Sequence, residues 1–432
     1  MDEAEAIAPF SAANPAIESV KERAHPLDAP GSRSFRAVAA VCLCGVFAFL
    51  NLYVTQPMLP LLERIFHASK SVVGLTVSAA TLGVAISAPI LGALAEHMSR
   101  KRVIVASTLV LCVPTLLAAS SPGLHALVFW RFLQGLILPG IFAITITYIG
   151  EEWEHRATPI VMSIYVSGTA LGGFIGRMVA GVAAERLSWR WSFLILGVMT
   201  LIGAAAIWRL LPQEAQPMAS EEVSVAAKLG AMLAHFRNPR LAATFALGFG
   251  MLFALVGTFT YVTFYLADAP FHLSTESLSY LFAIYLIGLV VTPAGGYMVT
   301  RIGMRAGIAL AIGACLAGAL VTLSHSLWIV VLVGLGLVCT GVFVAQATAN
   351  SFLRIAAPAG GRASAAGLYI CCYYMGGTAG GVLPAYMWSV GKWPACVGLI
   401  ACVLAITLGI ALVGWRMPEA EAAGQRGGGS VL

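Results

Sequence analysis

Gly92-Ala-Leu-Ala-Glu-His-Met-Ser-Arg-Lys-Arg102 is the stretch that decides the fold, because a run of small apolar residues passes within a few positions into three consecutive basic residues. The sequence on both sides of it is strongly hydrophobic. Such a basic cluster is difficult to place in a soluble core, whereas it is typical of a short cytoplasmic loop between two membrane helices. The stretch therefore predicts that the chain is a membrane protein.

The overall composition leads to the same prediction. Hydrophobic residues make up 59% of the 432 residues and charged residues only 10%, against roughly 45–50% and about 25% in soluble domains. Since a helix needs about 20 apolar residues to cross a bilayer, the length allows around twelve crossings with short connections. The 25 Lys and Arg residues are dispersed between apolar runs, so we expect a lipid bilayer around the protein and no nucleic-acid partner.

Apolar runs bounded by charged or turn residues predict twelve helices. They lie at about 36–60, 72–95, 103–120, 125–149, 159–184 and 191–211, and then at 240–267, 276–300, 306–323, 327–350, 364–388 and 394–415. The expected fold class is an all-α membrane protein with twelve transmembrane helices in two six-helix halves. The halves cover 36–211 and 240–415, joined by a cytoplasmic linker with a short amphipathic helix at 212–239 and flanked by disordered tails at 1–35 and 416–432.

The distribution of basic residues predicts the orientation of the chain. An even number of helices places both termini on one side of the membrane. The opposite side receives only five of the 25 Lys and Arg residues, namely Arg64, Lys70, Arg186, Arg190 and Lys392. Because loops rich in Lys and Arg stay in the cytoplasm, both termini are predicted to be cytoplasmic. Two further arginines, Arg131 and Arg177, fall inside predicted helices.

The two halves share weak internal similarity. The stretch from Gly92 to Lys101 recurs as Gly296-Tyr-Met-Val-Thr-Arg-Ile-Gly-Met-Arg305, and Arg156-Ala-Thr recurs as Arg362-Ala-Ser. Gly168-Thr-Ala-Leu-Gly-Gly173 recurs as Gly377-Thr-Ala-Gly-Gly381. These echoes stand at nearly the same separation, which indicates a duplicated chain, and internal repeats are how secondary transporters are built.

From Arg36 to Arg416 the sequence resembles the major facilitator superfamily. The opening stretch is similar to the superfamily signature G-x-L-A-D-R-x-G-R-K, with Glu96 in place of the aspartate. Arg131-x-x-Gln134-Gly135 resembles the R-x-x-Q-G motif of proton-coupled members. The pattern Gly168-x-x-x-Gly172-Gly173-x-x-Gly176 resembles the antiporter motif G-x-x-x-G-P-x-x-G-G, with Gly173 at the proline and Arg177 at the last glycine.

Two further stretches are similar to one group within the superfamily. Asn51-Leu-Tyr-Val-Thr-Gln-Pro-Met-Leu-Pro60 and Leu187-Ser-Trp-Arg-Trp-Ser-Phe193 resemble the YnfM-like group of efflux transporters in the drug:proton antiporter-like branch. The resemblance implies a multi-pass protein of a bacterial inner membrane. It also implies a monomer that binds a small-molecule substrate and takes the proton as its coupling ion.

Polar residues inside the predicted helices are candidates for the transport pathway, because an unpaired polar side chain is costly in hydrocarbon. The resemblance implies that helices 1, 4, 7 and 10 line the cavity. The candidates are Asn51, Thr55, Gln56, Arg131, Gln134, Thr258, Tyr261, Tyr265, Gln346, Asn350, Tyr369 and Tyr373. The tyrosines have a second reading as interfacial anchors or packing residues.

Arg131 and Arg177 are the most distinctive of the intramembrane residues, since a guanidinium stays protonated and must find acceptors there. We expect Arg131 to be the stronger candidate for a coupling element that changes partners between two conformations. The alternative is an arginine satisfied by backbone carbonyls and Gln134. No Asp or Glu lies in the centre of a predicted helix, and the nearest acids are Glu63 and Asp268 at predicted outer ends. Desolvation would let either titrate near neutral pH, and the alternative is that both are exposed interfacial acids.

Other candidates belong to gating and coupling rather than to the pathway. In the signature stretch they are Gly92, Glu96, Arg100 and Lys101, where we expect Glu96 to meet the start of helix 11 near Arg362 and latch the inner gate. The small-residue faces of helix 5 (Gly168, Gly172, Gly173 and Gly176) and helix 11 (Gly376 and Gly380) are expected either to pack helices closely or to let the two halves slide.

Taken together, these patterns predict a secondary transporter that exports a small organic compound against proton entry. An uptake symporter for an organic anion is the alternative, because two intramembrane arginines stand without central carboxylates. A membrane-embedded enzyme or a receptor is the remote alternative. The nine cysteines lie in apolar runs without C-x-x-C spacing, so we expect no metal and no cofactor.

Overall fold

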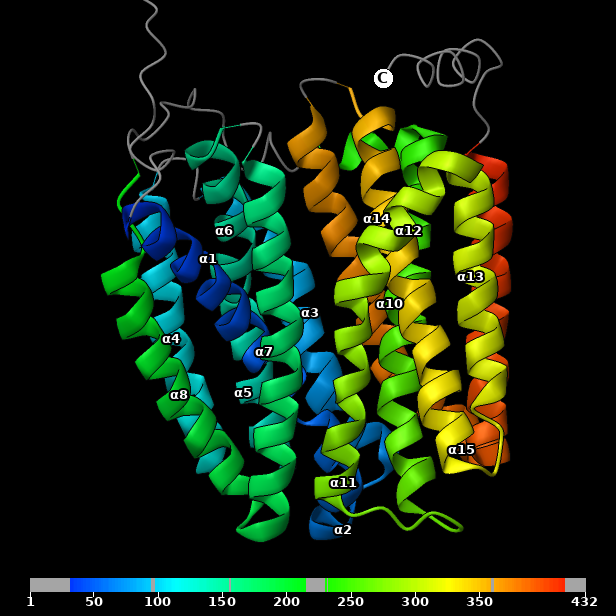
Figure 1. Ribbon diagram of the computed structural model, residues 1–432. Helices are drawn as coiled ribbons and strands as arrows, with labels where there is room; N and C mark the ends of the chain where they lie inside the picture. The colour runs from blue at the N-terminus through cyan, green and yellow to red at the C-terminus, as the bar shows by residue number, and fades with distance from the viewer. Residues whose placement is uncertain are drawn as a thin grey trace, which may run out of the picture.

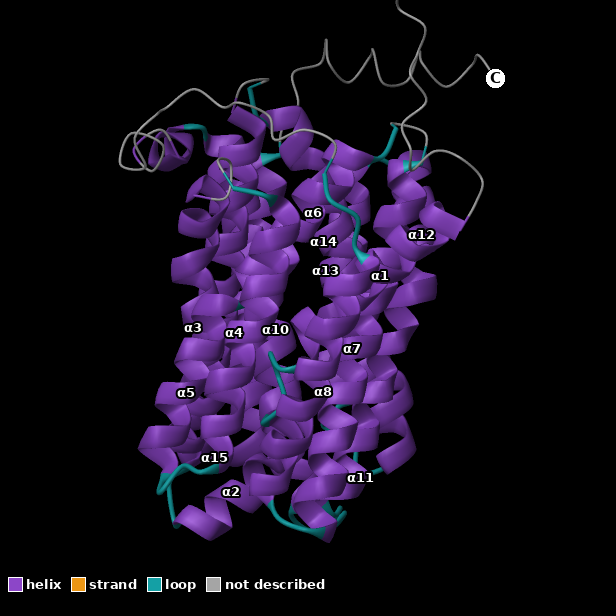
Figure 2. Cartoon of the chain, turned by 90° about the vertical axis from the view of Figure 1, so that its left-hand side faces the viewer, coloured by secondary structure: helices purple, strands orange, loops and turns teal. Residues whose placement is uncertain are grey.

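The computed structural model describes residues 32–94, 98–154, 157–214, 230, 232–358 and 361–415. Helices account for the secondary structure of these residues, and they run side by side as a bundle (Figures 1 and 2). The tails, Glu96 and most of the linker with its expected amphipathic helix lie outside the described residues, and Gly92 is described only as part of a helix.

The first half of the bundle runs from residue 32 to residue 210. Its elements are α1 (Ser32–Leu50), η1 (Gln56–Met58), α2 (Leu59–Phe66), α3 (Lys70–Leu94), α4 (Arg100–Ala119), α5 (Leu124–Ile137), α6 (Pro139–Glu152), α7 (Thr158–Arg186) and α8 (Trp189–Leu210). They form the blue to green group on the left of Figure 1.

The second half follows after the linker. Its elements are η3 (His235–Arg237), α10 (Pro239–Ala267), α11 (Thr275–Tyr280), η4 (Leu281–Ile287), α12 (Gly288–Ile302), α13 (Met304–Val321), η5 (Ile329–Leu335), α14 (Gly336–Ala356) and α15 (Arg362–Gly414). Gly391 and Lys392 are non-helical, so α15 is two helices that meet at a sharp turn.

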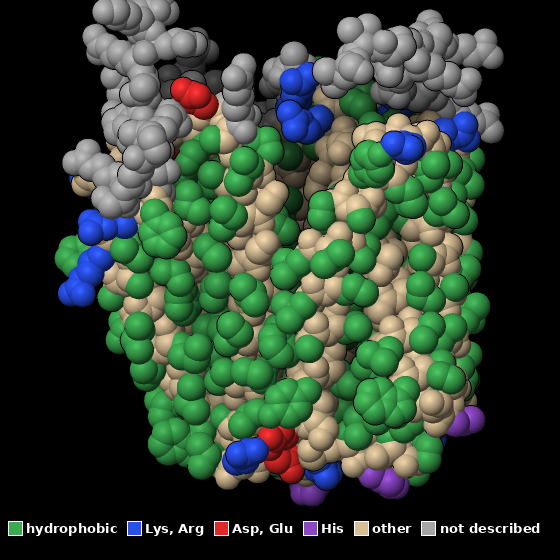
Figure 3. Space-filling view, in the orientation of Figure 1, with side chains coloured by type: hydrophobic (Ala, Val, Ile, Leu, Met, Phe, Trp, Pro, Cys, Tyr) green, Lys and Arg blue, Asp and Glu red, His purple; other side chains and the backbone are tan. Residues whose placement is uncertain are grey.

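These elements confirm the predicted fold class. Within the described residues, ten helical segments are long and apolar enough to cross a membrane, and Phe35–Leu50 is a shorter apolar helix. Ser364–Gly414 is a pair of helices and counts twice, and with Phe35–Leu50 the described residues make twelve crossings. A band of apolar side chains covers the outer surface between charged residues at the two ends (Figure 3). The chain is therefore a multi-pass membrane protein.

Helix 1 differs from the continuous helix expected at 36–60. It stops at Leu50, makes a turn through Asn51–Thr55, and resumes as η1 and α2. Pro57 and Pro60 lie at the first positions of η1 and α2, where a missing backbone N–H is tolerated. Figure 2 shows a short loop inside the bundle rather than at either end. The break leaves backbone carbonyls that need donors, which the site described below supplies.

The glycine faces hold helices together inside each half. A Cβ built on Gly168, Gly172 or Gly176 of α7 would lie 2.4, 2.0 or 1.9 Å from a carbonyl oxygen of α1. On α15, a Cβ on Gly376 or Gly380 would lie 2.0 or 2.5 Å from a carbonyl oxygen of α10. In this conformation, these glycines of α7 and α15 therefore pack closely against a helix of their own half.

The signature loop is bound to the first half by two sets of contacts. Arg100 at the start of α4 donates from Nε and Nη2 to Glu151 at the end of α6, at 3.1 and 3.0 Å. Glu214, just after α8, accepts from the backbone N–H of Lys101 at 3.4 Å. Partial burial raises the pKa of Glu214, but hydrogen bonds from Ser99 and from backbone N–H groups outweigh it and leave the pKa below its usual value.

The echo of the signature in the second half turns differently. Gly303 joins α12 to α13 with φ of 86°, a conformation that favours glycine. Ser99 occupies the equivalent position in the first half with φ of −56°, and its side chain caps α4 by accepting from the Arg102 N–H. A serine therefore replaces the signature glycine without strain, because this turn does not need a positive φ.

Candidate functional site

Arg131, from α5, supports the break in helix 1. Its Nε donates to the carbonyl of Thr76 at 3.0 Å, and Nη1 donates to the carbonyl of Asn51 at 2.7 Å. Further hydrogen bonds run from Nη2 to the carbonyl of Leu52 and from Nη1 to Oε1 of Gln134. Four of its five N–H groups thus have acceptors, and the side chain is completely buried.

A polar chain extends from Arg131 through the first half. Nε2 of Gln134 donates a hydrogen bond to Oγ1 of Thr115 at 2.9 Å. The side-chain amide of Asn51 donates to Oγ1 of Thr200 at 3.0 Å. These bonds connect helices 1, 3, 4 and 6. In this conformation Arg131 matches the alternative stated from the sequence, an arginine satisfied by carbonyls and Gln134.

Arg177, from α7, has a different environment. Its Nε donates to Oε1 of Gln56 at 2.9 Å, and Nη1 donates to the carbonyl of Gly173 at 2.7 Å. Three rings surround the guanidinium carbon, with centroids at 4.9 Å for Tyr53, 4.7 Å for Phe282 and 4.7 Å for Tyr285. The side chain is 2% exposed, and its contacts include both halves of the protein.

Gln56 also joins the two halves. While its oxygen accepts from Arg177, its Nε2 donates to Oγ1 of Thr260 on α10 at 3.2 Å. Between α3 and α15, the Ser78 hydroxyl donates to the carbonyl of Thr378 at 2.8 Å, and the hydroxyls of Thr81 and Thr378 lie 3.0 Å apart. These hydrogen bonds join helix 1 to helix 7 and helix 2 to helix 11 across the two halves.

Several buried polar atoms near these contacts have no hydrogen-bond partner among the described residues. They are Asn51 Oδ1, Thr55 Oγ1, Thr258 Oγ1 and the hydroxyl of Tyr369. All four residues are among the candidates that the sequence predicts. Because buried polar atoms are normally paired, unpaired ones on helices 1, 7 and 11 are the atoms that a substrate or water would satisfy.

The candidates of helix 7 form a stripe along one face, Thr258, Tyr261, Tyr265 and Asp268, and they have different surroundings. Tyr261 donates to the carbonyl of Gly381 at 2.8 Å, and Tyr265 donates to the carbonyl of Ser324 at 3.1 Å. Asp268 lies beyond the end of α10 and is exposed. The two tyrosines are therefore bound to the backbone of their own half, and Thr258 is the member of the stripe whose polar atom lacks a partner within the described residues.

The helix 10 candidates lie along one face of α14. Phe343, Gln346 and Asn350 are three to four residues apart, and Phe343 packs on Tyr285 with centroids 6.1 Å apart. Along this face Gln346 is half-buried and Asn350 is exposed. Exposure therefore increases from the Arg177 cluster toward the end of the bundle where α14 ends.

Among the described residues, the two ends of the bundle differ. We call the end where α1 begins and α15 ends the termini face, and the end that carries α2 and α11 the opposite face (Figure 1). The surface between the two halves is hollowed at the termini face (Figure 3). At the opposite face the halves are in direct contact.

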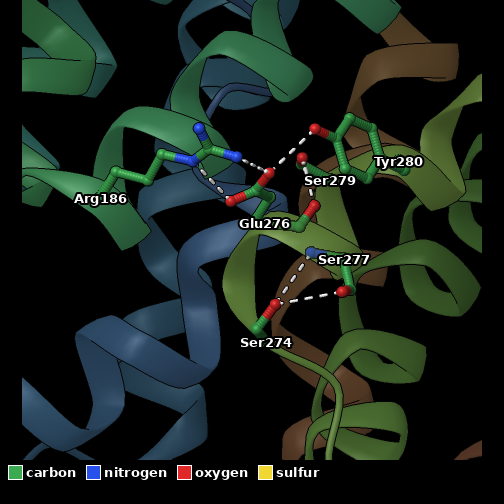
Figure 4. Close-up of polar contacts among 6 residues, drawn as sticks. All are labelled: Arg186, Ser274, Glu276, Ser277, Ser279 and Tyr280. Atoms are coloured by element: carbon green, nitrogen blue, oxygen red, sulfur yellow. Dashed lines mark hydrogen bonds and ion pairs between the residues drawn. The ribbon is translucent and has the colours of Figure 1, made fainter.

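An ion pair closes the opposite face. Arg186 at the end of α7 donates from Nε and Nη2 to both carboxylate oxygens of Glu276 on α11, at 2.9 and 2.7 Å (Figure 4). Tyr280 donates to the same carboxylate at 3.0 Å, and Glu185 accepts from the backbone N–H of Thr275 at 3.0 Å. These contacts connect helix 5 of the first half to helix 8 of the second.

A lysine makes a second contact between the halves at this face. Lys70 at the start of α3 pairs with Glu63 at 2.6 Å. Its ammonium also lies 4.7 Å from the ring centroid of Phe264 and 5.3 Å from that of Trp388, both in the other half. Glu63 is thus placed beside a cation that contacts both halves, whereas Asp268 is in an exposed loop.

Sequence reasoning missed the rings around Arg177. Phe282 and Tyr285 lie in η4, in an apolar run that carries no motif. Tyr53 lies inside the stretch from Asn51 to Pro60, but the motif there does not single it out. The replacement of a motif glycine by Arg177 is the one sequence signal that points here. The sequence also gave no indication that Arg131 has four N–H groups paired in this conformation and Arg177 two.

Comparisons with known proteins agree with this architecture. The Major Facilitator Superfamily profile matches residues 41–381. The chain is 31% identical over 380 residues to the MFS-type transporter YybF of Bacillus subtilis (strain 168), covering 88% of this chain and 93% of that protein. It is also 31% identical over 383 residues to the inner membrane transport protein YnfM of Escherichia coli (strain K12), covering 88% and 90%.

Solved structures share the fold at lower identity. A mutant form of the nucleoside transporter NupG aligns with a TM-score of 0.74 at 16% identity, covering 88% of this chain and 100% of that chain. A bacterial homolog of the human lysosomal transporter Spinster aligns with a TM-score of 0.68 at 14% identity, covering 89% and 96%. The chain belongs to the Major Facilitator Superfamily, whose members are secondary transporters and not enzymes.

Proposed function

We propose that this protein exports a small organic solute across a bacterial inner membrane by alternating access, driven by the inward movement of protons. The observation that carries the proposal is the one-sided closure of the bundle. The halves meet through Arg186–Glu276 and the Lys70 contacts at the opposite face and part at the termini face. Alternating access requires such a closure to form at each end in turn.

The proposed orientation places both termini in the cytoplasm. The excess of Lys and Arg residues at the termini face supports it, and the name of the relative YnfM supports the inner membrane. In this orientation the conformation described above faces inward. Export is supported by the antiporter-like glycine pattern of α7, and uptake of the same solute is the alternative that the transport assay distinguishes.

Proton coupling in this proposal involves Glu63 rather than a central carboxylate. Among the described residues, no Asp or Glu side chain binds the guanidinium of Arg131 or of Arg177. Glu63 pairs with the lysine that touches Phe264 and Trp388 of the other half. Loss of the Glu63 carboxylate charge, which Glu63→Gln imitates, would leave Lys70 without its ion-pair partner at the closed face.

The experiment uses purified protein in liposomes with an imposed pH gradient and labelled organic solutes inside or outside. We expect solute to leave the compartment into which protons flow, and we expect Glu63→Gln to weaken the dependence on the gradient. Arg64→Gln, a change at the neighbouring exposed residue, is the matched control. Accumulation of solute on the side that protons enter would show uptake instead, and transport that ignores the gradient would contradict proton coupling.

A further inference from the structure

We propose that Arg177 binds the anionic group of the transported solute, and that this solute is a small organic anion with an aromatic or apolar body. The inference rests on the proposed transport function and assigns its substrate class. It starts from the donors that Arg177 leaves unused. A guanidinium has five N–H groups, and the structure gives Arg177 two acceptors, Gln56 and the carbonyl of Gly173.

Arg177 keeps three N–H groups without an acceptor among the described residues. Nη2 has no hydrogen-bond partner there, and Nη1 uses one of its two N–H groups. The rings of Tyr53, Phe282 and Tyr285 lie around the guanidinium at 4.7–4.9 Å, and a ring offers the guanidinium no carbonyl or carboxylate acceptor. The N–H groups of a guanidinium can bind a carboxylate, sulfonate or phosphonate through two parallel hydrogen bonds.

The charge of Arg177 is also without a counter-charge. The electrostatic neighbours of the guanidinium are Tyr53, Tyr285 and Cys339, and no carboxylate is among them in the described residues. A buried charge in this setting is costly unless something compensates it. Cation–π contacts offset part of the cost, and an anionic ligand would offset the remainder.

Further aromatic residues lie beyond the rings around Arg177 and suit the body of such an anion. Tyr373 is close enough to Tyr53 and Tyr285 to interact electrostatically with both. Its ring stacks on that of Tyr369 with centroids 5.9 Å apart, and the buried hydroxyl of Tyr369 has no hydrogen-bond partner among the described residues. Aromatic faces beside an unpaired hydroxyl bind an aromatic acid better than a strongly hydrated ion.

The local sequence is adapted to an arginine at this position. Gly173 stands one helical turn before Arg177, and a Cβ built on it would lie 3.1 Å from Nη1. The glycine therefore leaves room for the guanidinium, and its carbonyl orients Nη1. The α7 sequence departs from the antiporter motif at two positions, with glycine in place of proline and arginine in place of glycine. These two residues contact each other, and the glycine makes room for the arginine.

Arg131 and Arg177 differ in how many of their N–H groups the protein itself satisfies. Both arginines are almost completely buried, but Arg131 uses four N–H groups on acceptors within the first half. Arg177 uses two, and it is surrounded by residues of both halves. A ligand on Arg177 would therefore be sensed by both halves, as a transported solute must be.

The test measures binding, so that its outcome is independent of transport. Purified protein in lipid nanodiscs is titrated with benzoate, 2-naphthoate and benzenesulfonate, each against its uncharged amide. We expect at least one anion to bind about tenfold or more tightly than its amide. Arg177→Gln should reduce the affinity for that anion about 10- to 100-fold, since a hydrogen-bonded charge is lost, while the affinity for the amide stays nearly constant.

Matched variants keep the test valid if one variant does not fold. Arg177→Lys keeps the charge but not the planar edge, so it should retain only part of the preference for the anion. Tyr285→Phe keeps the ring and should lower the affinity for the anion by a few-fold. Arg64→Gln removes an arginine outside the cluster and should change nothing.

Two results would overturn the inference. One is the absence of any preference for the three anions over their amides in the wild-type protein, and the other is a preference that survives Arg177→Gln or is unchanged in Arg177→Lys. Anion binding without gradient-driven transport would contradict the proposed function but support the anion site at Arg177. Gradient-driven transport of uncharged solutes without anion binding would support the proposed function and contradict the anion site.

Discussion

At the scale of single residues, the difference between Arg131 and Arg177 depends on where each N–H group points. Both arginines lie inside apolar helices, and the sequence distinguishes them only by the motif around each. The structure gives Arg131 the carbonyls left free by the break in helix 1, together with the Gln134 side chain. In this conformation Arg131 stabilises the break in helix 1, so we expect its replacement to lower the stability of the protein.

We predict that Arg131→Lys lowers the stability of the purified protein by roughly 1–3 kcal/mol, because a lysine ammonium cannot reach all the acceptors and leaves buried carbonyls unpaired. Thermal unfolding in detergent micelles measures the change. Arg177→Lys is the matched variant, and it should lower stability less because fewer protein acceptors lose a donor. Equal unfolding temperatures for wild type and Arg131→Lys would contradict the supporting role.

At the scale of helices, the glycines of α7 show how close packing limits substitution. The Cβ position on Gly172 lies 2.0 Å from the carbonyl oxygen of Val46 and 2.6 Å from its Cα. Because these are backbone atoms, a rotamer change cannot relieve the overlap. The helices would have to separate, and the position of the break in helix 1 depends on their contact.

We predict that Gly172→Ala destabilises the protein by about 1–3 kcal/mol through overpacking of α7 against α1. Gly313→Ala in α13 is the control, since a Cβ there meets nothing within 4 Å. The control should be neutral or stabilising by up to about 1 kcal/mol, because alanine favours helix more than glycine does. Chemical or thermal unfolding of the two variants compares them directly, and equal effects would show that the α1 contact is not what restricts position 172.

At the scale of the whole molecule, the closed face depends on few contacts. The Arg186–Glu276 pair is partly exposed, with 66% and 20% of the two side chains accessible. Solvent screens an exposed pair and its side chains lose entropy on pairing, so its net contribution is small. The pair therefore biases the balance between conformations without locking it, which suits a gate that must open in each transport cycle.

We predict that Glu276→Gln increases opening at the opposite face by up to about fivefold, because the pair biases the gate only weakly. The measurement is the rate at which a membrane-impermeant maleimide labels Ser279→Cys, a fully buried position packed against Gly181 of α7, in a background without the nine native cysteines. Glu154→Gln, an exposed acid at the termini face, serves as control. An unchanged labelling rate would show that the Arg186–Glu276 pair does not influence opening of this face.

Much of the architecture was predictable because it follows from local physics. Apolar run length predicts where helices cross the bilayer, and all twelve crossings are where those runs place them. The break at Asn51–Thr55 was not predictable in this way, because prolines and polar residues in a span are compatible with a kinked helix as well as with a turn. The role of the glycine faces was also undecided, since small residues permit close approach without specifying which helix approaches.

The membrane fold, its two halves and its family are predictable from the amino-acid sequence, because they depend on hydrophobic length and on motifs that lie close together along the chain. The signature stretch from Gly92 to Arg102 is recognisable in the same way, and its Arg100 binds Glu151, 51 residues further along the chain. The acceptors of each arginine, the closed face of the bundle and the rings around Arg177 become visible in the three-dimensional structure. Those properties depend on side chains from distant helices meeting at one point, and the pairing of donors with acceptors there is set by packing in three dimensions rather than by sequence neighbours.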